Sequence, residues 1–201
     1  MPECFKKYPD TRVVLDCTEV SVITPNCLRC KIRTYSHYKG GQTVKILVGV
    51  SPSGFITFIS KAYGGKASDK QIFEESDIIK KNLLEPGVDA VMVDKGFRID
   101  QVCDEIGVKI HRPPFIVKKQ ALTAANAKKN AEIANARVHF ERIMQQLKIF
   151  RILQSKLSWS IIPFLDDIFI VIAGLVNVGP PIFVEERFMT FEKVLKNAIM
   201  L

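Results

Sequence analysis

The sequence predicts an α/β fold in which a mixed sheet is followed by one long helix and further helices. Three β-rich runs come first, and a helix, a strand, a second helix and a short strand follow them. A longer segment with helical periodicity comes next. With 201 residues, of which 47% are hydrophobic and 25% charged, the chain is large enough to bury one hydrophobic core.

The first three predicted strands lie within residues 12–60. The apolar run at 12–16 stops at Asp16, and a carboxylate is unfavourable inside a buried strand. The runs TVKILVGV (43–50) and GFITFIS (54–60) are rich in β-branched and aromatic residues. Because a short Ser-Pro-Ser stretch and a glycine separate them, these two runs predict a β-hairpin.

Two helices and two further strands are predicted between residues 63 and 110. Ser68 or Asp69 can cap the first helix, in which apolar residues recur at roughly helical spacing. The strand that follows, AVMVD, again stops at an aspartate, Asp94. The second helix and the last strand are expected at residues 99–106 and 108–110.

A long helix is predicted at residues 123–156, because apolar residues recur there at steps of three and four. They are Ile133, Ala136, Phe140, Ile143, Leu147 and Phe150. The other faces are basic, since residues 116–156 contain nine Lys or Arg and two Glu. Most of the net charge of +8 therefore lies here, which indicates an anionic partner such as nucleic acid.

Asp16 and Asp94 suggest a common site. If their strands lie parallel and adjacent, both carboxylates emerge at the same edge of the sheet, where open α/β sheets place their sites. Two carboxylates at close range repel unless a cation or a shared proton separates them. Magnesium or manganese suits such oxygen ligands. Taken alone, however, an aspartate at a strand end commonly caps a turn or the next helix.

The long basic helix supplies a third carboxylate, Glu141. Arg137 and Lys148 lie on roughly the same stripe of this helix, so cations flank the carboxylate. Such a group could reach a metal ion while its neighbours hold phosphates. The simpler alternative is an ion pair between Glu141 and Arg137 on a solvated helix face.

Signals for membrane insertion or secretion are weak. The N-terminus has no apolar signal segment, and the apolar run at 161–181 is interrupted by Asp166 and Asp167, so we expect a buried helix there. Five cysteines suit a reducing compartment better than a disulfide framework. Cys27 and Cys30 form one CxxC pair without a second pair, which disfavours structural zinc.

Several motifs in this order resemble the catalytic domain of DDE transposases, in particular the DDE superfamily endonucleases of Harbinger-like elements and THAP-domain transposon-derived proteins. The motifs are VVLDCTEV, TYSHYKGGQTVKILVGVSPSGFITFISKAYGGKASDKQI, AVMVDKGFRI, HRPPF and IANARVHFERIMQQLKIFRIL. The resemblance runs from about residue 9 to residue 177. It implies an RNase H-like fold, in agreement with the predicted order of strands and helices.

The resemblance also implies the chemistry. Asp16, Asp94 and Glu141 match the catalytic and metal-binding triad, and Asp69, in the glycine-rich GGxxSD segment, is a second-tier candidate. In this family the triad binds divalent cations, Mg²⁺ or Mn²⁺, and two of them are expected. The expected reaction is hydrolysis of phosphodiester bonds at transposon ends, followed by strand transfer. No small-molecule cofactor and no membrane are expected.

We expect residues 9–178 to form the catalytic domain and residues 179–201 a C-terminal tail, with no N-terminal DNA-binding domain of the kind that relatives carry. DNA is the expected partner, self-association is left open, and a nuclear location follows from the substrate alone. The predicted DNA-binding residues are Lys118, Lys119, Lys128, Lys129, Arg137, Arg142 and Lys148.

Two other functions compete with the nuclease. A domesticated, catalytically inactive protein that associates with DNA would keep the fold without needing the triad. A phosphatase of the haloacid dehalogenase type also begins with an apolar strand ending in aspartate. That family has a second aspartate two residues later, where this chain has Thr18, so the phosphatase is disfavoured.

Overall fold

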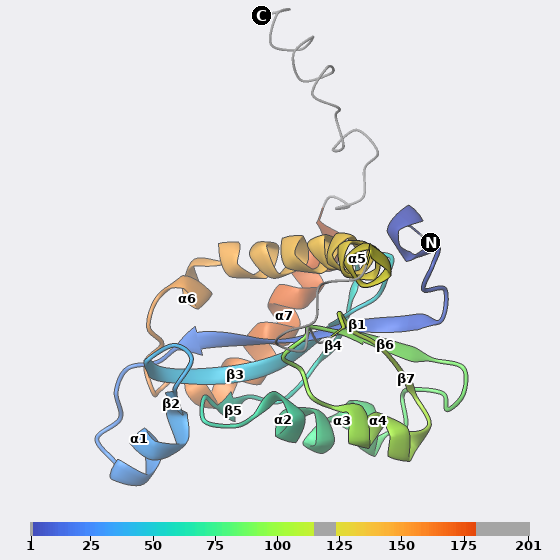
Figure 1. The fold of residues 1–201 in the computed structure, drawn as a ribbon. Helices are drawn as coiled ribbons and strands as arrows, with labels where there is room; N and C mark the ends of the chain where they lie inside the picture. The colour runs from blue at the N-terminus through green and yellow to red at the C-terminus, as the bar shows by residue number, and fades with distance from the viewer. Residues whose placement is uncertain (1, 115–123, 180–201) are drawn as a thin grey trace, which may run out of the picture.

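The computed structural model describes residues 2–114 and 124–179. They form a mixed sheet with helices on both faces (Figure 1). The strands are β1 (Thr11–Ser21), β2 (Tyr35–Ser36), β3 (Gly41–Val50), β4 (Ile56–Ile59), β5 (Tyr63–Gly64), β6 (Ala90–Val93) and β7 (Lys109–His111). A mixed α/β fold is therefore confirmed.

The strand order of the sheet is β2-β3-β1-β6-β7, and β4 and β5 also pair with β3. β3 runs antiparallel to β1 and to β4, which confirms the predicted hairpin. β1 and β6 run parallel and adjacent, with Leu15 opposite Val93, and β7 continues the parallel half. The expected arrangement of the two aspartate-bearing strands is thus confirmed.

Nine helices, two of them short 3-10 helices, accompany these strands within the described residues. They are η1 (Glu3–Phe5), α1 (Leu28–Thr34), α2 (Asp69–Glu75), α3 (Asp77–Lys80), α4 (Asp100–Ile106), α5 (Ala124–Ile149), α6 (Arg151–Gln154), η2 (Ile162–Phe164) and α7 (Leu165–Val178). Ser68 caps α2, because its Oγ accepts a hydrogen bond from the Gln71 amide at 3.1 Å.

Two hydrophobic cores lie on the two faces of the sheet, because successive strand residues point to opposite sides. Val14 and Met92 face the core formed with α5 and α7. Leu15, Val91 and Val93 face the core formed with α2, α3 and α4. Figure 1 shows α5 and α7 on one side of the sheet and α2 to α4 on the other. The sheet is therefore covered on both faces, as strands with near-continuous apolar runs require.

Asp16 does not end its strand, which corrects the first prediction. β1 continues to Ser21, and Asp16 pairs with Val48 of β3 within it. β6, by contrast, stops at Val93, directly before Asp94. Asp16 is therefore the first residue of β1 beyond its parallel pairing with β6. The antiparallel pairing of β1 with β3 continues past it.

The long helix is shorter than predicted. α5 ends at Ile149, and Phe150 adopts an extended backbone with ψ 119° before the short helix α6. Thr123, its predicted first residue, lies outside the described residues. The predicted apolar face is confirmed from Ile133 to Leu147, where each predicted residue is buried.

The apolar segment at 161–181 was predicted to be a buried helix, and only one face of α7 is buried. Leu165 and Phe169 enter the core, whereas Ile170 and Val171 are 58% and 61% exposed. The polar residues of α7 fix it to the sheet: Asn177 both donates to and accepts from the backbone of Ile56. No helix in the described part of the chain has the length and apolar character to cross a membrane.

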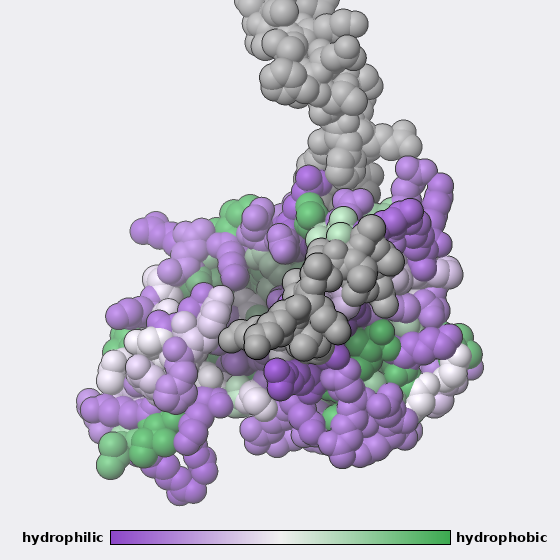
Figure 2. Space-filling model, in the orientation of Figure 1, coloured by the Kyte–Doolittle hydropathy of each residue, from purple (hydrophilic) through white to green (hydrophobic). Residues whose placement is uncertain are grey.

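The surface in the orientation of Figure 1 is mostly hydrophilic (Figure 2). An apolar area stands out over α1, where Leu28 and Ile32 are 72% and 51% exposed. These two side chains are four residues apart and so lie on one face of the helix.

Candidate active site

The sheet brings Asp16 and Asp94 together. Leu15 and Val93 are partners in the parallel pairing of β1 and β6, so the next residue of each strand is one of the two aspartates. Each carboxylate accepts a hydrogen bond from the backbone amide that follows it. These bonds are 2.8 Å long from Cys17 N to Asp16 Oδ1 and 2.7 Å long from Lys95 N to Asp94 Oδ1. Both side chains are therefore held by local backbone at the same position along the sheet.

Arg137 of α5 bridges the two carboxylates. Its Nη1 lies 2.6 Å from Asp94 Oδ1, and its Nη2 lies 3.5 Å from Asp16 Oδ2. The Arg137 side chain is only 13% exposed, and its Nε is buried without a hydrogen-bond acceptor. A permanently charged group on the helix thus compensates two carboxylates on the sheet.

The pKa of Asp16 is raised to about 6. Burial is the largest cause, and the negative charges of Asp94 and Asp69 also raise this pKa. The Cys17 amide and the Arg137 guanidinium lower this pKa, but they do not cancel the effect of burial. A carboxyl group with a perturbed pKa beside a second carboxylate is typical of a functional site.

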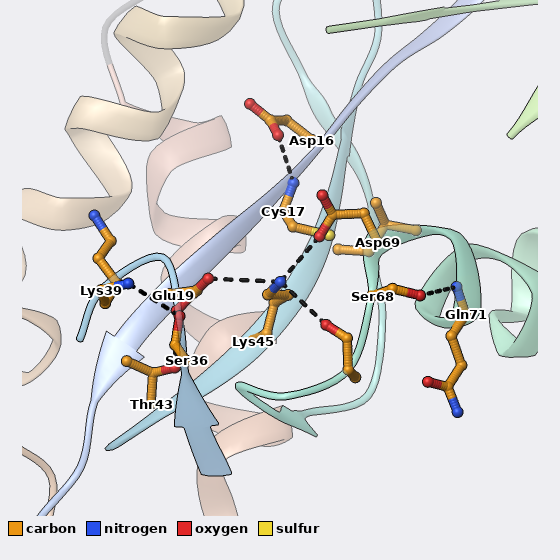
Figure 3. Close-up of polar contacts among 12 residues, drawn as sticks. Asp16, Cys17, Glu19, Ser36, Lys39, Thr43, Lys45, Ser68, Asp69 and Gln71 are labelled. Carbon is orange, nitrogen blue, oxygen red and sulfur yellow. Dashed lines mark hydrogen bonds and ion pairs between the residues drawn. The ribbon is translucent and has the colours of Figure 1, made fainter. Parts of the chain in front are cut away.

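Asp69, the second-tier candidate, pairs with Lys45 on the side of Cys17 away from Asp16 (Figure 3). Lys45 Nζ lies 3.1 Å from Asp69 Oδ1 and 3.5 Å from Glu19 Oε1, and it donates to the Ala67 carbonyl at 3.1 Å. Thr43 Oγ1 donates to the other oxygen of Glu19 at 2.8 Å. Lys45 and Glu19 are opposite each other in the pairing of β1 and β3, which explains why they meet.

The charge on Lys45 is stabilised by its partners. Burial opposes the charged form, but Asp69 and Glu19 outweigh it, so the pKa of Lys45 is raised. Between this group and Asp16 lies Cys17, whose thiol has its pKa raised by burial and by Asp69. Asp69 is thus close enough to influence Asp16 electrostatically, while its own ion pair is with Lys45.

Glu141 does not join the aspartates in this structure. It lies on α5, one turn after Arg137, and its side chain is exposed. Among residues 2–114 and 124–179, no three His, Cys, Asp or Glu side chains are grouped so that they could hold a metal ion. The role of Glu141 therefore stays a prediction, as does the closed triad.

The predicted DNA-binding residues are only partly described. Lys118 and Lys119, and the side chain of Lys129, lie outside the described residues. Lys128 and Lys148 are exposed on α5, as a contact with DNA requires. Arg137 was predicted to contact DNA, and here it contacts Asp16 and Asp94 instead of lying open to solvent. The DNA-binding role of these residues therefore stays a prediction.

Sequence reasoning missed two features of the site. It placed Arg137 beside Glu141 on one stripe of the helix but did not connect it with the aspartates. It also missed the Glu19 and Lys45 pair. Aligning the antiparallel strands residue by residue would have found that pair, because opposite charges then face each other.

Comparison with known families finds a match to the model described as DDE superfamily endonuclease, over residues 15–177. This range contains Asp16, Asp69, Asp94, Arg137 and Glu141. Neither a curated protein nor a solved structure matches the chain.

Proposed function

Because this chain belongs to the DDE superfamily endonucleases, we propose that it is a divalent-metal-dependent endonuclease or transposase domain that cleaves DNA. The observation that carries the proposal is the pair of carboxylates, Asp16 and Asp94, held side by side where β1 leaves β6. A nuclear location follows only from the choice of DNA as substrate.

We further infer that the fold is RNase H-like. Three antiparallel strands, β1, β3 and β4, are followed by two strands that extend the sheet in parallel on the other side of β1. The long helix α5 then returns across one face of this sheet. This arrangement supports the inference, because it brings a helix from the end of the domain to the aspartates.

The residues fit a divalent cation. The aspartates offer carboxylate oxygens, the ligands that Mg²⁺ and Mn²⁺ prefer, and a positive group already lies between them. A bound divalent cation would supply Lewis acidity at the phosphodiester and stabilise the leaving oxygen. In the proposal, Asp16 and Asp94 hold the cations and Glu141 completes the set. The exposed lysines of α5 then orient the DNA backbone.

A second candidate is a catalytically inactive protein that retains the fold and associates with DNA. One observation favours it: Arg137 already compensates both aspartates without a metal ion. In that case the carboxylates would serve only as structural partners of the arginine. The two candidates differ in whether DNA cleavage depends on metal and on Asp94.

The test is nicking of supercoiled plasmid DNA by the purified chain with Mg²⁺ or Mn²⁺. The matched variants are Asp94→Asn and Asp104→Asn, the latter an exposed aspartate of α4. The nuclease reading expects metal-dependent nicking that is retained in Asp104→Asn and lost in Asp94→Asn. Nicking at the same rate in both variants would refute the assignment, and no nicking at all would favour the inactive protein.

A further inference from the structure

We propose that Arg137 is a resident counter-cation of the aspartate pair and exchanges with the divalent metal ion. In this reading the guanidinium stabilises the metal-free protein and leaves the carboxylates when the metal binds. The inference rests on the proposed function, since it requires that Asp16 and Asp94 bind metal. It adds that metal affinity is set by competition within the chain.

The contacts place the guanidinium where a shared cation would lie. Arg137 uses two different nitrogens to reach Asp94 Oδ1 and Asp16 Oδ2, at 2.6 and 3.5 Å. Asp16 Oδ1 is already engaged by the Cys17 amide. On the Asp16 side, a shared metal ion would therefore draw on Oδ2, the oxygen that Arg137 now contacts.

Charge makes the two cations mutually exclusive. A guanidinium remains protonated at any physiological pH, so it cannot relieve the conflict by losing its proton. Metal-to-oxygen distances of about 2.0–2.2 Å would place the ion within a few ångströms of the arginine nitrogens. Two positive groups at that separation repel strongly in a half-buried site.

The hydrogen bonding of Arg137 shows that its position is a compromise. Its Nε is buried and has no acceptor, although the other two nitrogens are engaged. A buried donor without a partner costs free energy, which lowers the cost of moving the side chain away. Glu141 and Lys148 lie on the same stripe of α5 as Arg137 and are exposed, so solvent is reachable for a displaced Arg137 side chain along this face.

The test measures Mn²⁺ binding by calorimetry and thermal unfolding without metal, on the full chain. The variants are Arg137→Met, which keeps the apolar stem, and Arg151→Met, an exposed arginine of α6, as control. Arg137→Met should bind Mn²⁺ about tenfold more tightly or better, because the competing charge is gone. It should also unfold at a lower temperature without metal, and Arg151→Met should match the parent in both measurements.

A second measurement is made on the parent chain and does not depend on the stability of Arg137→Met. In the parent chain, labelled with ¹⁵N-arginine, the Nε–H signal of Arg137 should move and exchange faster with water when diamagnetic Mg²⁺ is added. Arg137→Lys would be used only to assign the signal. An unchanged signal at saturating Mg²⁺ would overturn the exchange.

The outcomes separate this inference from the proposed function. Equal Mn²⁺ affinity in the parent and in Arg137→Met, with binding lost in Asp94→Asn, would overturn the exchange and leave the metal site intact. Absence of Mn²⁺ binding in all three proteins would overturn both the exchange and the metal-dependent function.

Discussion

Replacing Asp16 by Asn should stabilise the metal-free protein at neutral pH. The pKa of Asp16 is raised to about 6 in the folded state, mainly by burial, against 3.8 for an ordinary aspartate. The folded state therefore binds more protons than the unfolded state between these values, and its stability falls as the pH rises through 6. Asparagine removes the charge and keeps one oxygen, which can still accept from the Cys17 amide, whereas the 3.5 Å contact of Arg137 Nη2 with the other Asp16 oxygen is lost.

The magnitude follows from the size of this pKa shift. A shift of about two units corresponds to about 3 kcal/mol of unfolding free energy. The Asp16 side chain is 35% exposed, so solvent screening reduces the expected effect to about 1–2 kcal/mol. Arg137 keeps its shorter contact with Asp94 in the variant, so its charge remains paired.

The assay is urea unfolding of the parent and of Asp16→Asn between pH 4 and 8 with a chelator present. The variant should be more stable by about 1–2 kcal/mol above pH 6, which is about 3–6 °C in melting temperature for a chain of this size. The gap should close as the pH falls toward 4, because Asp16 is then protonated in the folded protein and no buried charge remains. A variant less stable than the parent at pH 8, or a gap independent of pH, would refute the reasoning.

Two further substitutions test the buried ion pairs of Lys45 and the proposed DNA-binding face of α5. Lys45→Met should cost about 3 kcal/mol in urea unfolding because it leaves two carboxylates without their buried partner, whereas Lys70→Met, at an exposed helical pair, should cost about 0.5 kcal/mol or less. Equal losses of unfolding free energy in the two variants would mean that the buried ion pairs of Lys45 contribute no more to stability than the exposed pair of Lys70. Lys148→Ala should weaken DNA binding for any sequence and lower the slope of log affinity against log salt by about one, as measured by fluorescence anisotropy. An unchanged slope would mean that this face of α5 is only solvated.

Five strands, β1, β3, β4, β6 and β7, could be predicted from the sequence because they contain apolar or β-rich runs, whereas the two-residue strands β2 and β5 were not predicted. Two such runs ending in aspartate suggested the hypothesis that the strands lie parallel and adjacent, and the pairing of β1 with β6 confirms it and aligns Asp16 with Asp94. The continuation of β1 past Asp16 was missed. There Thr18 and Val20 are buried while their neighbours are not, an alternation that only the partner strand β3 makes stable.

Other parts of the fold depend on contacts that no local pattern encodes. Gly64 is the last residue of the short strand β5, and a Cβ at this residue would lie 2.3 Å from the Arg33 carbonyl oxygen. The glycine therefore permits a close approach between segments far apart in sequence. Similarly, no glycine or proline marks the end of α5. The helix stops at Phe150 because the extended backbone there lets Leu153 and Leu157 turn into the core.

The electrostatics of the aspartate pair bear on the choice between an active and an inactive protein. A purely structural role for Asp16 would be served better by asparagine, because the ionised carboxylate destabilises the fold at neutral pH. Arg137 compensates this charge only in part, since the pKa of Asp16 stays raised beside it. A divalent cation would stabilise the charged form more strongly and so turn the same carboxylate into a favourable ligand. The proposed metal site would therefore compensate an electrostatic cost that Arg137 alone leaves in place.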